Sequence, residues 1–261
     1  MFQFIAPGPM HFMLLMVGLV ASMLVTMECG WRLGRRRAQR DPEGAEKGIA
    51  ELDSLVFALF GLMLAFTFSG AVQRFQDRRD LINDEANAIG TAYLRISLLP
   101  PDSQPLLRET FRHYVEVRLR APKTMLEGGV DETSKVQTAI WNQAIAALQA
   151  HQGPPIVDAV LDPINEMIDL TSTRWLAART HPPLAIFLLL IGMALACAFL
   201  VGHGMGASQR RYLAHALAFT LSISAVIYLL IDVEFPRAGL IQVSFADQVL
   251  ENALNSMAPP P

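Results

Sequence analysis

The chain has 261 residues, of which 52% are hydrophobic, and its formal net charge is −3 at pH 7. This mildly negative charge gives no global field of the kind that attracts nucleic acid, so a nucleic-acid-binding role is not expected. The apolar residues are concentrated in runs and are not spread evenly, which favours a membrane protein over a soluble protein with a large core.

Four of these runs predict membrane-spanning helices. None of them contains Asp, Glu, Lys or Arg, and each is close to the roughly 20 apolar residues that a helix needs to cross a bilayer. The first run is followed, not preceded, by arginines, which is the reverse of a cleaved signal peptide, so we interpret it as a retained span. The runs are Met10–Met27, Ser54–Val72, Leu184–Gly202 and Tyr212–Ile231.

A linker at 30–53 follows the first span, and a longer polar region separates the second span from the third. We divide the chain into a first transmembrane pair at 1–74, a helical extramembrane insert at 75–182, a second transmembrane pair at 183–235 and a polar tail at 236–261. A short turn at 202–209 is expected between spans three and four. The predicted fold class is an all-α integral membrane protein with four transmembrane helices and a helical extramembrane bundle between spans two and three.

The insert is predicted to be helical because its apolar residues recur at helical spacing. No strong breaker lies between Ser54 and Leu99, so the second span is expected to continue out of the membrane as one long helix. Further helices are expected near 103–119 and 132–150, and a last one after Asp162 as N-cap with Pro163 in its first turn. The predicted buried stripes are Ile82, Ala86, Ile89, Tyr93 and Ile96; Leu107, Phe111, Tyr114 and Val115; Val136, Ile140, Ala144 and Leu148; and Ile164, Ile168, Trp175 and Leu176.

Small residues recur at four-residue spacing in three of the spans, a pattern that lets helix backbones approach closely. It fits packing within one subunit or between subunits and does not distinguish the two. The stripes are Gly61, Ala65 and Ser69; Gly192 and Ala196; and Ala214, Ala218 and Ser222.

Motifs that carry catalytic chemistry are missing. There is no P-loop, no G-x-S-x-G and no H-E-x-x-H, and the two cysteines, Cys29 and Cys197, form no metal-binding spacing. The Gly-rich run at 202–206 is interpreted as a plain turn. We therefore expect neither an enzyme nor a cofactor nor a bound metal.

The second span offers candidates for a pore. No ionisable residue lies in the middle of any span, which argues against an ion-coupled transporter and leaves room for a pore gated by apolar constriction. Leu62 and Phe66 lie one turn apart and are the constriction candidates. Further pore-lining candidates are Leu59, Thr67, Ser69 and Gln73.

The stretch from Leu62 to Asn87 resembles the end of the second span in bestrophins, where an apolar helix leaves the membrane into an Arg-Phe run. The stretch after span four, Asp232 to Val243, looks like a signature of bestrophin-like bacterial membrane proteins, and the stretch Glu85 to Tyr93 is also similar to that group. The matching residues are Arg74, Phe75, Arg79 or Arg78, Leu81, Glu85, Asn87, Asp232, Pro236 and Gly239.

The resemblance implies a pentameric anion channel whose second spans surround the pore, with Leu62 and Phe66 near its apolar neck. Val72 replaces a usual aromatic residue and Thr67 a usual basic one, and both departures bear on anion selectivity more than on fold. No calcium clasp can be mapped onto this chain. The resemblance also implies a cytoplasmic insert, whereas positive-inside counting narrowly favours the 30–53 linker on that side, so the orientation stays open.

Two hypotheses remain. In the first, the protein is an oligomeric ion channel, with a homo-oligomer, the lipid bilayer and an inorganic ion as its partners, in the bacterial inner membrane. In the second, it is a non-conducting membrane anchor or interaction protein whose helical insert binds a partner protein.

Overall fold

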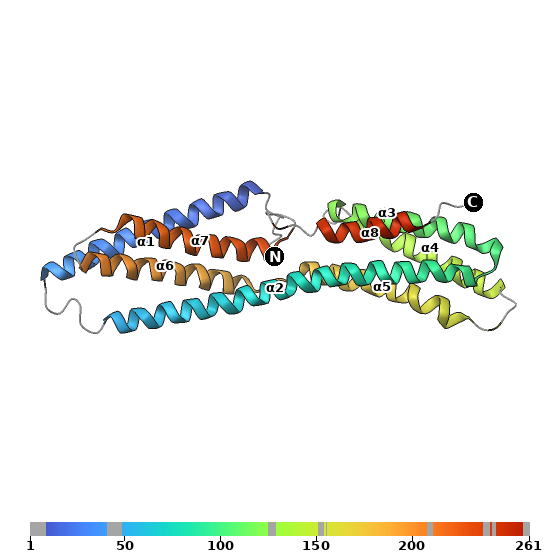
Figure 1. Ribbon diagram of the computed structural model, residues 1–261, viewed down its shortest axis with the longest axis horizontal. Helices are drawn as coiled ribbons and strands as arrows, with labels where there is room; N and C mark the ends of the chain where they lie inside the picture. Colours follow the sequence, from blue (N-terminus) through green and yellow to red (C-terminus); the bar gives the residue numbers. More distant parts are fainter. Residues whose placement is uncertain are drawn as a thin grey trace. The chain divides into compact units, whose positions relative to one another are not determined.

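The computed structural model describes residues 9–40, 49–124, 129–150, 154, 156–207, 211–236, 241 and 244–257. Every regular element in this described part of the chain is a helix, as Figure 1 shows. The chain forms two compact units. The first comprises Met1–Phe75 and His181–Gln242, and the second comprises Gln76–Thr180 and Val243–Pro261.

The first unit contains the membrane-spanning helices. They are α1 (Pro9–Arg40), the first part of α2 (Ile49–Arg95), α6 (Leu184–Ala207) and α7 (Leu213–Glu234). Among the described residues, four helices are long and apolar enough to cross a membrane. Three of the predicted spans lie inside these helices and the fourth begins one residue before α7, so the predicted fold class is confirmed.

Large apolar side chains of this unit lie on its outer surface. Leu15, Val17, Leu188 and Leu221 are each more than half exposed. Such a surface is unfavourable in water and normal against lipid, where no hydrophobic penalty drives these side chains inward. The interior is small by comparison and centres on Met23, Met27, Phe60, Leu190, Ala194, Cys197, Ala198, Ala216, Ile227 and Leu230.

Helices α1 and α6 pack through reciprocal glycine pairs. A Cβ atom added at Gly30 or Gly34 of α1 would overlap the carbonyl oxygens of Phe199 or His203 on α6. A Cβ atom added at Gly202 or Gly206 of α6 would overlap the carbonyl oxygens of Met27 or Trp31 on α1. Each helix therefore presents a small-xxx-small pair to the other, and the two backbones lie in direct contact.

This contact corrects two expectations. The run at 202–206 is not a turn, because α6 continues through it to Ala207 and uses its glycines for packing. The residues from Gly30 to Arg40 are not a linker, because α1 continues to Arg40. In both cases the contacting glycines are helical, since close helix contact compensates for their weak helix propensity.

The second unit is a helical bundle. It contains the rest of α2, two short 3₁₀ turns at Ile96–Leu98 and Pro101–Ser103, α3 (Gln104–Thr124), α4 (Gly129–Ala150), α5 (Val157–Arg179) and α8 (Ser244–Ser256). The long helix predicted for the second span is confirmed, since α2 has 47 residues. The first two predicted stripes are buried throughout, as are Val136, Ile140 and Ala144.

The start of α5 differs from the prediction. The helix begins at Val157, so Pro163 lies inside it and not in its first turn. Proline has no N–H to donate to the carbonyl four residues earlier, which here belongs to Ala159. Arg95 of α2 supplies the missing donor, with Nη1 at 2.8 Å from the Ala159 oxygen, which removes part of the cost of an interior proline.

Helix α8 lies in the region that we expected to be only a polar tail. It packs on α3, and Arg112 of α3 donates a hydrogen bond from Nη1 to the Met257 carbonyl at 2.6 Å. Leu250 of α8 is 1% exposed. The residues after the fourth span therefore contribute a helix to the second unit.

Candidate functional site: an exposed row on the second span and its charged flank

One face of α2 carries a row of side chains that are exposed in the described part of the chain. Leu59, Leu62 and Phe66 are 53%, 54% and 71% exposed. Ser69 and Gln73 are also exposed and continue the row at the same helical spacing. The face with Phe60 and Ala71 packs into the unit instead, with exposures of 3% and 0%.

Small residues flank this row. Ala58, Gly61 and Ala65 are exposed, and no atom lies within 4 Å of a Cβ added at Gly61. The other predicted small-residue stripes, on α6 and α7, are likewise exposed in the chain. The stripes predicted from the sequence are thus not used within the first unit, whose close helix contact employs Gly30, Gly34, Gly202 and Gly206.

Thr67 lies apart from the row. Successive helical residues are about 100° apart, so Thr67 points well away from the neighbouring Phe66. It is half-buried, and its Oγ1 donates to the Met63 carbonyl at 2.7 Å. The hydroxyl therefore forms its hydrogen bond within its own helix, as polar side chains in membrane helices commonly do.

An ion pair fixes the end of the row. Arg74 donates from Nη2 to Glu234 Oε2 at 2.7 Å and from Nε to the same carboxylate at 3.0 Å and 3.2 Å. Glu234, the last residue of α7, is fully buried. The Nδ1 atom of His181 lies 3.0 Å from Glu234 Oε1, and its ring stacks on Phe235. One carboxylate therefore ties the end of α7 to α2 and to the segment before α6.

A second carboxylate from the stretch Asp232 to Val243 binds the backbone of the residues after α7. Asp232 is fully buried, and its Oδ2 accepts a hydrogen bond from the Ile241 backbone N–H at 3.0 Å. Pro236, between them, is buried. Gly239, the remaining motif residue here, lies outside the described residues.

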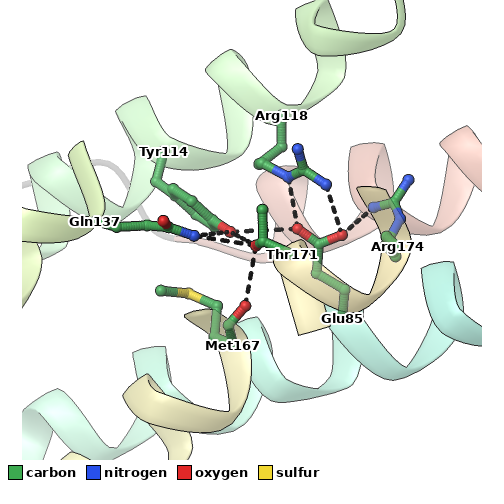
Figure 2. A network of polar contacts seen from close by, with 7 residues as sticks. All are labelled: Glu85, Tyr114, Arg118, Gln137, Met167, Thr171 and Arg174. Carbon is green, nitrogen blue, oxygen red and sulfur yellow. Dashed lines mark hydrogen bonds and ion pairs between the residues drawn. The ribbon is translucent and has the colours of Figure 1, made fainter. Parts of the chain in front are cut away.

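Glu85 lies at the centre of a buried polar network in the second unit, shown in Figure 2. It is fully buried, and Arg118 of α3 donates from Nε to Oε1 at 2.6 Å and from Nη2 to Oε2 at 3.0 Å. Arg174 of α5 also donates to Glu85 Oε2. Burial alone would raise the pKa of Glu85, but the two guanidiniums outweigh it and hold this pKa below its ordinary value.

Neutral groups complete the network. The Tyr114 hydroxyl donates to Glu85 Oε1 at 3.2 Å and lies 2.8 Å from Thr171 Oγ1. Gln137 of α4 donates to Thr171 at 3.0 Å. Burial, together with the negative charge of Glu85, raises the pKa of Tyr114. The network joins α2, α3, α4 and α5, so the sequence motif residue Glu85 acts on the bundle and not on the exposed row.

The remaining motif residues are dispersed. Phe75 and Leu81 are half-buried, whereas Arg79 and Asn87 are exposed. Sequence reasoning found Glu85 and Arg74 but missed their partners Arg118, Arg174 and Glu234. A detectable signal existed for Arg118, which continues the predicted buried stripe of Phe111 and Tyr114 at helical spacing. Among the described residues no cluster of His, Cys, Asp and Glu could hold a metal ion.

In the described part of the chain, the all-helical fold and its four long apolar helices define a helical protein of the membrane type. The family model of the bestrophin-like domain matches residues 20–247, and the chain belongs to this family. Two solved structures of a bacterial bestrophin homologue from Klebsiella pneumoniae, both single-substitution variants, have the same fold. They match with TM-scores of 0.69 and 0.67 at 14% and 15% identity, over 92% and 91% of this chain and 98% of theirs.

A third structure, a variant of a membrane protein, matches with a TM-score of 0.66 at 17% identity, over 92% of this chain and 98% of that one. No curated protein sequence matches the chain. At these identities the structural matches establish the fold, and they cover nearly all of both proteins.

Proposed function

We propose that this protein is an oligomeric ion channel, selective for anions, in which copies of α2 surround a pore. The observation that most directly supports this proposal is the exposed row on α2. Leu59, Leu62 and Phe66 present a continuous apolar face that no other described helix covers. Membership of the bestrophin-like family, whose characterised members are anion channels, supports the same function.

The pore requires several copies, because the row faces outward from a single chain and cannot enclose a path alone. The small residues Gly61 and Ala65 beside it would let a second copy approach closely. Closed rings are the usual outcome when one surface binds a different surface of an identical copy. The proposal therefore includes a homo-oligomer, placed in the bacterial inner membrane.

Within the pore, Leu62 and Phe66 form the constriction and Ser69 and Gln73 the more polar continuation. Apolar rings gate by excluding water, since an ion cannot shed its hydration in a dry segment. Thr67 is left out of this lining because it points away from the row and bonds to Met63. Arg74 does not supply a free charge to the path, because it pairs with Glu234.

The decisive experiment is current through purified full-length protein in planar bilayers, under chloride and then potassium gradients. Phe66→Ala should change unit conductance or open probability because it removes a bulky constriction side chain. Phe68→Ala is the matched control, since Phe68 packs against the core of the first unit. A reversal potential that follows chloride supports the anion channel, and a potassium-following one contradicts its selectivity.

The alternative is a non-conducting membrane anchor, and one observation favours it. The first part of the row, from Leu59 to Phe66, is as apolar and exposed as Leu15 and Leu188, which lie on the outer surface of the first unit. Folded, oligomeric protein that passes no current would support this reading. The helical insert at 75–182 would then be the binding module for a partner protein.

A further inference from the structure

A hollow lies at one end of the first unit, where α1, α6 and α7 meet. Between α6 and α7 there is an open groove of about 370 Å³, and its walls are almost entirely apolar. Its lining residues are Val201, Met205, Tyr212, His215, Ala216 and Phe219. Its volume is within the range of sites that bind small molecules.

A second hollow of about 170 Å³ adjoins the groove. Met205, Tyr212 and Ala216 line both, so the two form one continuous surface. The second hollow extends to Glu28 and Trp31 on α1 and to Arg211 before α7. One end of the combined hollow is thus apolar and the other end carries charge.

The charged end has an excess of guanidinium groups. Arg32 and Arg211 both pair with Glu28 Oε1, at 2.9 Å and 3.3 Å. The Arg211 guanidinium lies 3.7 Å from the Trp31 ring centre, and the Arg35 guanidinium lies 5.2 Å from it. Among the described residues, Arg32 and Arg211 thus share the Glu28 carboxylate, and Arg35 lies against the same indole as Arg211.

The depth of this cluster matches the edge of the bilayer. The uncharged run of α1 ends at Met27, directly before Glu28, and α7 begins at Leu213, directly after Arg211 and Tyr212. Trp and Tyr side chains favour this interfacial level, where an aromatic ring meets both hydrocarbon and water. The apolar groove lies on the membrane side of this level and the arginines on the water side.

We propose that the combined hollow binds an anionic phospholipid. An acyl chain fills the groove beside Val201 and Phe219, and the phosphate lies at Arg211 and Arg35, whose charge Glu28 only partly neutralises. The apolar acyl chain thus contacts an apolar surface, and the anionic phosphate contacts a cationic one. A soluble anion would leave the apolar groove unused, and a zwitterionic lipid would gain less from the excess of arginine. The proposal does not depend on whether the protein conducts ions.

The test is native mass spectrometry of the full-length protein in detergent, titrated with phosphatidylglycerol or with phosphatidylcholine of the same acyl chains. We expect tighter binding of phosphatidylglycerol. Arg35→Gln and Arg211→Gln should each weaken it about fivefold, since a basic residue at the membrane surface contributes ~1 kcal/mol. Arg120→Gln is the matched control, because Arg120 forms an exposed i,i+4 ion pair with Glu116 in the second unit.

Equal binding of the two lipids, or undiminished phosphatidylglycerol binding in both arginine variants, would overturn the proposal. If Arg211→Gln disturbs folding through Glu28, Arg35→Gln decides alone, because it leaves the Glu28 ion pairs intact. Displacement of the lipid by excess inorganic phosphate would also overturn it, by revealing a bare anion site.

The groove is tested separately. Val201→Phe fills it and should lower phosphatidylglycerol retention severalfold. Leu188→Phe also introduces a phenyl ring on α6, at a position that is 59% exposed and outside the groove, and should leave retention unchanged. Retention that is unchanged in Val201→Phe would contradict the placement of the acyl chain.

Discussion

Gly202 of α6 lies so close to Met27 of α1 that the Met27 carbonyl oxygen occupies the space where a Cβ atom would be. The same relationship repeats at Gly206, Gly30 and Gly34. Backbone contact of this kind cannot relax by a rotamer change, so the two helices would have to separate to accept any side chain.

We therefore expect Gly202→Ala to destabilise the first unit by about 1–3 kcal/mol or more, the cost of overpacking a close contact. Gly204→Ala is the control, because it lies two residues away on the same helix with no atom within 4 Å of its added Cβ. The midpoint of thermal unfolding of the detergent-solubilised protein measures the difference. Equal midpoints for the two variants would show that α1 and α6 are not in this contact.

The Glu85 network gives a second prediction. Glu85→Gln leaves Arg118 and Arg174 buried without a counter-charge, and breaking a buried ion pair in this way costs about 3–5 kcal/mol. Asp84→Asn changes the same charge at an exposed neighbouring position, so it should change stability by less than about 0.5 kcal/mol. Hydrogen exchange of the 104–120 segment in the full-length protein reports the loss. Unchanged exchange in Glu85→Gln would contradict the network.

The spans and most of the bundle stripes were predictable because they depend on local patterns, although Leu176 of the last predicted stripe is 61% exposed. An uncharged run of bilayer length and an apolar stripe at helical spacing each describe one helix by itself, and burial of Ile89 and Phe111 followed directly. The pairings were not predictable, because Glu85 and Arg174 are 89 residues apart and Arg74 and Glu234 are 160 apart. Nothing in a single sequence links residues at such separations.

The glycines of α6 also show that a local pattern does not predict contacts between distant residues. A local reading treats the glycines from 202 to 206 as chain breaks, since glycine is a poor helix former. The helical packing of Gly202 and Gly206 depends on α1, which contacts these two glycines from far away in sequence. The role proposed for the α2 row is also non-local, because the proposal requires other copies of the chain, and it stays a prediction until current is recorded.

The same network makes the stability of the second unit depend on pH. The folded-state pKa of Glu85 is lowered from 4.5. The ionised carboxylate thus stabilises the fold fully above pH 4.5, and this contribution is lost as the pH falls through the lower folded pKa. Tyr114 has a raised pKa, so above pH 10 ionisation of the unfolded chain lowers stability.

Thermal unfolding midpoints across the acid range measure this dependence. Glu85→Gln, which cannot ionise, should show a flatter acid limb than the parent protein, and Tyr114→Phe should show a flatter alkaline limb. A parent-like acid limb in Glu85→Gln would assign the acid sensitivity to other carboxylates.

The contact between Arg95 and Ala159 allows a test of how an interior proline is tolerated. Arg95→Met removes the donor that replaces the missing N–H of Pro163, and we expect it to cost about 0.5–1.5 kcal/mol, the usual net value of one hydrogen bond. Pro163→Ala restores an N–H that can bond to Ala159 within the helix. In that background Arg95→Met should cost much less, so the double-mutant cycle should give a coupling of the same size. Equal costs of Arg95→Met in the two backgrounds would show that Arg95 does not substitute for the proline's missing donor.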